Sequence, residues 1–202
     1  MNLLAHSFLS GSSTKILIGN FIADFIRGNQ YTHLEEEIVR GIYLHRKIDQ
    51  FTDEHPAVRQ STLRLRPEYG KYAPVLVDVF YDHFLSLHFE IFSDTPLEAH
   101  AQHTYRVLLD NQSVLPEIVQ NFLPRMVAQN WLARYGEWDG LQKSLQGINH
   151  RARFANHLDQ SIQSLRADYE AYNQDFLAFF PEIVQFVAQD LSEDDSGGMA
   201  QV

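Results

Sequence analysis

The chain contains no cysteine in its 202 residues. A chain without thiols forms no disulfide framework, no thiolate zinc site and no iron–sulfur cluster, and it has no cysteine nucleophile. We expect a cytoplasmic protein, because such proteins need no disulfides.

Glycine and proline are also scarce, with ten and seven residues. No apolar run is long enough to span a bilayer. The opening segment MNLLAHSFLSGSS lacks a basic start and soon becomes polar, unlike a secretory signal. We therefore expect neither a targeting segment nor any association with a membrane.

Positive charge is in short supply, and the formal net charge is −10. This balance argues against general nucleic-acid binding. Residues 1–72 carry nine Lys or Arg and eight Asp or Glu, whereas residues 73–202 carry seven and eighteen. An acidic partner would therefore approach the N-terminal part more easily. The alternative is an acidic surface that only keeps the protein in solution.

Apolar residues recur at helical spacing along nearly the whole chain. Hydrophobic residues make up 45% of it, enough for a full core. We predict an all-α protein with one compact domain over residues 1–191 and a flexible tail over 192–202. The predicted helices span residues 2–9, 14–27, 34–54, 57–66, 70–92, 96–110, 115–128, 137–147, 153–178 and 182–191.

Four of these helices carry polar residues four positions apart within apolar surroundings. Residues at this spacing share one face of a helix. The sets are Asn2 with His6, Asn20 with Asp24, His45 with Asp49 and Asp53, and Asp78 with Asp82, which His83 follows directly.

The predicted helices 14–27 and 70–92 are apolar nearly all round, which is typical of buried helices. Their carboxylates would then lie in the interior and would need a hydrogen-bonding partner, an ion pair or a metal. Helical bundles bind metals where such side chains converge. A mixture of oxygen and nitrogen ligands favours Mn²⁺, Fe or Mg²⁺. The predicted metal ligands are Asp24, His45, Asp49, Asp78 and Asp82.

Simpler interpretations remain open for several of these residues. His6 could be a core or capping histidine. Asp49 could pair with Arg46 or Lys47 at the surface, and Asp53 could cap the turn that follows it. The pattern predicts a polar or metal cluster but names no substrate.

At these same residues the chain resembles the acyl carrier protein phosphodiesterase family. The matching stretches are MNLLAH (1–6), GNFIADFIRGN (19–29), GIYLHRKIDQFTDEHP (41–56), DVFYDHFL (78–85) and, more weakly, WLARY (131–135). Several separate motifs in the right order make the resemblance specific over about the first 92 residues.

The resemblance implies a helical fold distantly related to the HD phosphohydrolases and a metal-dependent hydrolysis, usually with manganese. The reaction would release 4′-phosphopantetheine from the serine of holo acyl carrier protein. HD enzymes are named for an adjacent His-Asp pair, which this chain lacks; Asp82 and His83 stand in the reverse order. The ligand set of ordinary HD enzymes therefore cannot be copied onto this chain.

The hypothesis for the mechanism is attack of a metal-activated water on phosphorus. Asp24, His83 and His6 are the predicted catalytic residues, and either histidine could donate a proton to the leaving serine oxygen. Arg27 and Arg46 are candidates to neutralise the phosphate, although both could form ordinary salt bridges.

An acidic carrier protein would need a basic docking surface. The predicted docking residues are Arg59, Arg64, Arg66 and Lys71. Scattered surface charges are the simpler interpretation of these four.

Two other functions fit the residues. The chain could be an HD-like phosphohydrolase that acts on a nucleotide or another small phosphodiester. It could also be a catalytically silent helical protein that binds a carrier protein, with its polar cluster satisfied by internal salt bridges. The sequence does not indicate an oligomeric state.

Overall fold

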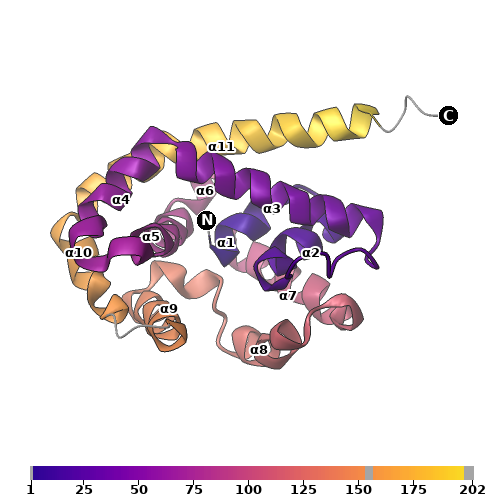
Figure 1. Ribbon diagram of the computed structural model, residues 1–202, viewed down its shortest axis with the longest axis horizontal. Helices are drawn as coiled ribbons and strands as arrows, with labels where there is room; N and C mark the ends of the chain where they lie inside the picture. Colours follow the sequence, from indigo (N-terminus) through magenta and orange to yellow (C-terminus); the bar gives the residue numbers. More distant parts are fainter. Residues whose placement is uncertain (1, 153–156, 198–202) are drawn as a thin grey trace.

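The computed structural model describes residues 2–152 and 157–197 (Figure 1). Within these residues all regular structure is helical, so the predicted all-α class is confirmed. The α-helices are α1 (Leu3–Phe8), α2 (Thr14–Ile22), α3 (Glu36–Glu54), α4 (Pro56–Tyr69), α5 (Ala73–Leu87), α6 (Phe89–Phe92), α7 (Leu97–Asp110), α8 (Glu117–Ala128), α9 (Trp138–Arg151), α10 (Ser161–Ala167) and α11 (Tyr169–Gly197). Short 3₁₀ turns join several of them, namely η1 (Ala23–Phe25), η2 (Gly70–Tyr72), η3 (Gln112–Val114), η4 (Ala133–Gly136) and η5 (Leu158–Gln160).

Helix α5 runs through the middle of the molecule and is buried on nearly every side, as its apolar sequence predicts. Its Phe80, Tyr81 and Phe84 pack against aromatic residues of α11, including Tyr172 and Phe176. Helices α3 and α11 lie alongside each other at the top of Figure 1, with α1 and α2 beneath α3.

Helices α2 and α3 cross with their backbones in contact. A Cβ atom on Gly19 would lie 1.9 Å from the carbonyl oxygen of Ile38, and one on Gly41 would lie 2.3 Å from that of Ile16. Only glycine fits at either position. This close crossing brings Asn20, next to Gly19, against His45, one turn after Gly41.

Several predicted boundaries are wrong. The helix predicted over 14–27 ends at Ile22, where a 3₁₀ turn replaces it. The break predicted between 178 and 182 is absent, because α11 continues through Pro181. Proline in a helix costs about 3 kcal/mol, and burial of Phe180 and Ile183 offsets that cost.

The helix predicted over 153–178 instead comprises η5, α10 and the start of α11, and its first residues, 153–156, lie outside the described residues. At the other end, α11 extends to Gly197, into the predicted tail. Residues 198–202 lie outside the described residues.

No described helix combines the length and the apolar character that crossing a membrane requires.

Candidate metal centre

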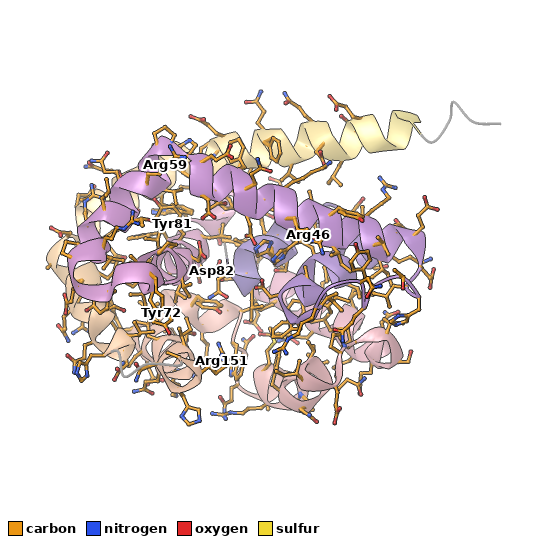
Figure 2. The ribbon with its side chains drawn as sticks, viewed as in Figure 1. Arg46, Arg59, Tyr72, Tyr81, Asp82 and Arg151 are labelled. Carbon is orange, nitrogen blue, oxygen red and sulfur yellow. The ribbon has the colours of Figure 1, made fainter. Side chains whose placement is uncertain are left out.

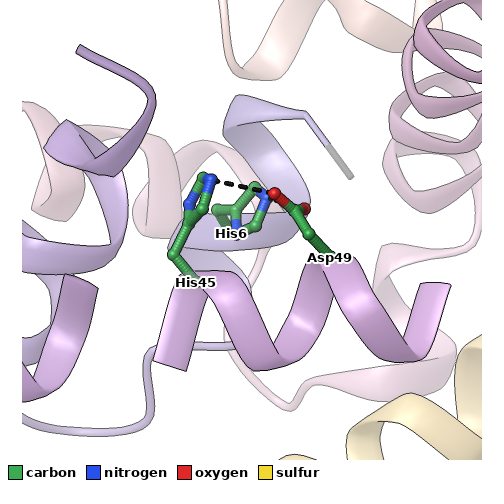
Figure 3. A group of neighbouring side chains, drawn as sticks. All are labelled: His6, His45 and Asp49. Carbon is green, nitrogen blue, oxygen red and sulfur yellow. Dashed lines mark ion pairs between the residues drawn. The ribbon is translucent and has the colours of Figure 1, made fainter. Parts of the chain in front are cut away.

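Two histidines from different helices stack face to face (Figure 3). The rings of His6, on α1, and His45, on α3, have centroids 3.8 Å apart and planes inclined by 15°. Asp49 lies one turn along α3 from His45. Its Oδ1 is 3.2 Å from Nε2 of His6, and its Oδ2 is 3.2 Å from Nε2 of His45.

One ligand atom from each of His6, His45 and Asp49 can be chosen so that all three lie within 4.8 Å of one another. Among the described residues this is the one group of three or more His, Asp or Glu side chains with that geometry. His45 and Asp49 were predicted ligands, whereas His6 was predicted to act in catalysis.

Asp24 reaches the same histidine from the turn η1. Its Oδ1 lies 3.2 Å from Nε2 of His45. Its side chain is 63% exposed, so the expectation that Asp24 is buried is wrong. The reason is that α2 ends at Ile22, which turns Asp24 out of the apolar interior and toward the rim of the cluster.

The opposite edges of both rings are anchored by oxygen atoms of one residue. Nδ1 of His6 lies 2.8 Å from Oδ1 of Asn20, and Nδ1 of His45 lies 2.8 Å from the backbone carbonyl oxygen of Asn20. A carbonyl oxygen only accepts hydrogen bonds, so Nδ1 of His45 carries a hydrogen. The Nε2 atoms of both rings then face the carboxylates.

The cluster suits a divalent cation, because Nε2 of His6 is buried and has no hydrogen-bond partner. Although Oδ1 of Asp49 is 3.2 Å away, the two atoms do not form a hydrogen bond of acceptable geometry. A buried polar atom without a partner is rare in folded proteins. Two imidazole nitrogens beside carboxylate oxygens form a donor set that Mn²⁺, Fe or Zn²⁺ accepts.

The same contacts shift the pKa values of the cluster in opposite directions. Burial, reinforced by the neighbouring His45, lowers the pKa of His6 to about 4. Burial also opposes the charged form of His45, but hydrogen bonds to Asp24 and Asp49 outweigh it and raise the pKa of His45 to about 9. Burial opposes the charged form of Asp49 as well, and the two histidines overcome it and hold the pKa of Asp49 well below its usual range.

Asp82, a predicted metal ligand, lies instead at the start of α1 (Figure 2). Its two carboxylate oxygens accept the backbone N–H groups of Leu4 and Ala5 at 2.9 and 3.0 Å. The first N–H groups of a helix have no partner within it, and Asn2 at the N-cap supplies none. Asp82 is completely buried and caps α1 from α5.

The structure does not bring His83 to the cluster. Its Nδ1 lies 2.8 Å from the carbonyl oxygen of Tyr135, and its Nε2 lies 2.9 Å from the hydroxyl of Tyr169. Nδ1 of His83 is thus engaged by η4 and Nε2 by α11. Asp78 is half-buried on α5, where burial raises its pKa, and it is not among the three grouped ligands.

The predicted phosphate-binding arginines are both exposed. The guanidinium of Arg46 lies over the rings of Tyr31 and Tyr43, with its carbon 5.3 and 5.4 Å from their centroids. Such cation–π contacts restrict a long side chain. The backbone N–H of Arg27 donates to Gln30 at 3.1 Å.

Of the predicted docking residues, Arg59 and Arg66 line one groove between α4 and α5. The groove has a volume of about 330 Å³. Its other lining residues are Asp53, Val58, Thr62, Leu63 and Pro74. Arg64 points elsewhere, into an ion pair with Asp175 of α11. Lys71 lies over the ring of Tyr72.

The helical spacing pairs Asn20 with Asp24 but indicates no function for it. The available signal was an amide on an otherwise apolar helix, four residues before Asp24. The spacing could not show that Asn20 contacts two histidines, because those contacts depend on the crossing of α1 and α3 over α2.

A family model described as acyl carrier protein phosphodiesterase matches residues 1–183. The chain belongs to this family. Proteins named acyl carrier protein phosphodiesterase from Salmonella dublin, Salmonella newport and Salmonella heidelberg are each 36% identical over 193 residues, covering 94% of this chain and 98% of theirs. No solved structure matches the chain.

These matches confirm the resemblance seen in the sequence and the prediction that the chain is a phosphodiesterase of acyl carrier protein. The family match extends well beyond the first 92 residues, where the recognisable motifs lie. Kinship with the HD fold stays a prediction.

Proposed function

We propose that His6, His45, Asp49 and Asp24 bind a divalent cation at which the phosphodiester of holo acyl carrier protein is hydrolysed. The products would be 4′-phosphopantetheine and the apo carrier with a free serine. The observation that carries the proposal is the buried Nε2 of His6, which lacks a hydrogen bond and points with Nε2 of His45 at one carboxylate.

Manganese is the favoured cation because the family resemblance implies it, and the donor set of two imidazoles with carboxylates accepts it. Magnesium prefers oxygen ligands and suits two histidines less well. Iron fits the donor set equally well. A cation bound here supplies Lewis acidity, which acidifies water and neutralises negative charge on a phosphoryl group.

Asp24 is placed to accept a proton from the attacking water. It stands at the exposed rim of the cluster, and hydrogen bonding to His45 outweighs burial and lowers its pKa, so it is a carboxylate at neutral pH. Because Nε2 of His6 would bind the cation, His6 is not retained as proton donor to the serine oxygen. Arg46 stays the candidate for binding the phosphate, since two tyrosines restrict its guanidinium.

The groove lined by Arg59 and Arg66 is the proposed docking site for the carrier protein. It starts at Asp53, one turn along α3 from Asp49. Leu63 is 62% exposed there and Val75, next to Pro74, is 41% exposed. Apolar side chains flanked by arginines suit an acidic amphipathic helix. A carrier-protein substrate also supports the predicted cytoplasmic location.

The proposal is tested by incubating the purified protein with holo acyl carrier protein and Mn²⁺ and recording the intact mass of the carrier. The carrier should lose the mass of 4′-phosphopantetheine, and neither EDTA-treated enzyme nor the Asp49→Ala variant should cause the loss. His103→Ala, at an exposed position on α7, is the matched control and should leave the reaction unchanged. Loss of the prosthetic group in EDTA would refute a metal-dependent site.

A further inference from the structure

Asn20 is a completely buried polar residue on α2 that takes no part in the proposed chemistry. Its side chain and its backbone carbonyl both contact the cluster. A buried amide of this kind is costly unless it is fully hydrogen-bonded. The details of its hydrogen bonds show what it does.

The orientation of the Asn20 amide follows from its neighbours. Its Nδ2 lies 2.9 Å from the carbonyl oxygen of His6, which can only accept, so the nitrogen must be at that end. Nδ2 also donates to Oγ of Ser10 at 3.0 Å. Ser10 can accept there because its own hydrogen goes to the same His6 carbonyl, at 2.7 Å.

With Nδ2 fixed, Oδ1 of Asn20 faces Nδ1 of His6 and accepts its hydrogen. A neutral imidazole has a single N–H. If that hydrogen is on Nδ1, then Nε2 of His6 presents a lone pair to the space beside Asp49. The backbone carbonyl of Asn20 likewise holds a hydrogen on Nδ1 of His45, so that a cation would bind His45 through Nε2 after displacing the hydrogen there.

We propose that Asn20 is a positioning residue that holds a hydrogen on Nδ1 of both histidines, as metal binding through Nε2 requires. Its side-chain oxygen controls His6, and its backbone oxygen controls His45. Histidine ligands generally donate their other N–H to an oxygen that fixes their orientation. Here a single residue supplies both oxygens, so the spacing of the two rings is tied to the position of α2.

The two contacts can be separated, because Asn20→Ala removes only the side-chain oxygen. ¹⁵N NMR of the metal-free protein, labelled in its histidine rings, distinguishes protonated from unprotonated ring nitrogens. In Asn20→Ala the hydrogen of His6 should move to Nε2, because no oxygen then accepts it at Nδ1 and the negatively charged Asp49 lies 3.2 Å from Nε2. His45 should keep its hydrogen on Nδ1, because the backbone carbonyl is unchanged, and it therefore serves as an internal control.

The same variant should bind Mn²⁺ about 10- to 100-fold more weakly by calorimetry, the range found when such supporting contacts are lost. Ser10→Ala, which removes only a neighbour of the amide, should leave the tautomer of His6 unchanged.

A hydrogen on Nε2 of metal-free, neutral His6 in the unaltered protein would overturn the proposal, as would equal loss of Mn²⁺ affinity in Asn20→Ala and Ser10→Ala. The inference rests on the metal site of the proposed function, but the NMR experiment needs neither metal nor substrate. If the tautomers are as stated and Mn²⁺ does not bind, the proposed function fails while the role of Asn20 in fixing the tautomers stands.

Discussion

The polar residues of α3 and of α5 look alike in the sequence, yet the structure uses them differently. His45 and Asp49 on α3 point at Nε2 of His6 and at Asp24, and they leave a buried nitrogen without a hydrogen bond. Asp82 on α5 has the same spacing from Asp78, but both of its oxygens accept backbone N–H groups. The unpartnered nitrogen of His6 marks the proposed metal site, whereas the fully hydrogen-bonded carboxylate of Asp82 marks a helix cap.

The two regions are nevertheless connected through α1. Asp82 holds the first turn of this six-residue helix, and His6 lies in its last turn. A helix this short is not stable by itself. Asp82 therefore determines where His6 stands.

The largest expected effect comes from substituting His45 on α3. His45→Ala removes a proposed ligand and should lower Mn²⁺ affinity and turnover by more than about 100-fold, above the range for supporting residues. The fold should survive, because His45 is held mainly by the polar cluster. Activity assays with holo carrier protein and manganese titrations measure both quantities. Undiminished manganese binding in His45→Ala would remove it from the ligand set.

Substituting Asp82 on α5 should mainly lower the free energy of unfolding. Asp82→Ala leaves the N–H groups of Leu4 and Ala5 buried without partners, at a cost of about 2–4 kcal/mol. Urea unfolding of the metal-free protein measures this loss. Manganese affinity should fall by only about tenfold, through displacement of His6. A loss of affinity as large as that of His45→Ala, with unchanged stability, would instead make Asp82 a ligand.

The sequence predicted the helical class and most helices, because apolar spacing reports burial directly. It also selected the helices that meet at the cluster. It could not place Asp24 at the exposed rim of the cluster or Asp82 at the start of α1, because those positions depend on where α2 ends and on which backbone N–H groups lie near α5. The role of Asn20 could not be predicted for the same reason, because it depends on contacts between residues far apart in the chain.

Asp82 also predicts a pH dependence of stability. Burial raises its pKa to about 7, despite the backbone hydrogen bonds from Leu4 and Ala5, whereas the unfolded value is ~3.9. The folded state therefore binds the proton more tightly, and the stabilisation is lost as pH rises toward and through 7.

This dependence is measured as the free energy of unfolding of the metal-free protein minus that of Asp82→Asn. The difference should fall between pH 5 and 7, by at most about 1.4 kcal/mol per pH unit, and should level off above pH 8. Subtraction removes the contribution of His45, whose raised pKa of about 9 acts over an overlapping range. A difference that does not vary with pH would show that Asp82 is ionised throughout.

The smallest expected effect lies outside both regions, in the groove between α4 and α5. Reversing charge in the double variant Arg59→Glu and Arg66→Glu should raise KM for holo carrier protein roughly tenfold, with kcat little changed, because charges at the edge of an interface act mainly on association. Higher salt should raise KM for the unaltered protein more than for the variant.

Arg106→Glu, an exposed position on α7, is the matched control. Hydrolysis of a small phosphodiester such as bis(p-nitrophenyl) phosphate should be equal in all three proteins. A double variant with unchanged KM for the carrier would move the docking surface elsewhere and leave the metal centre untouched.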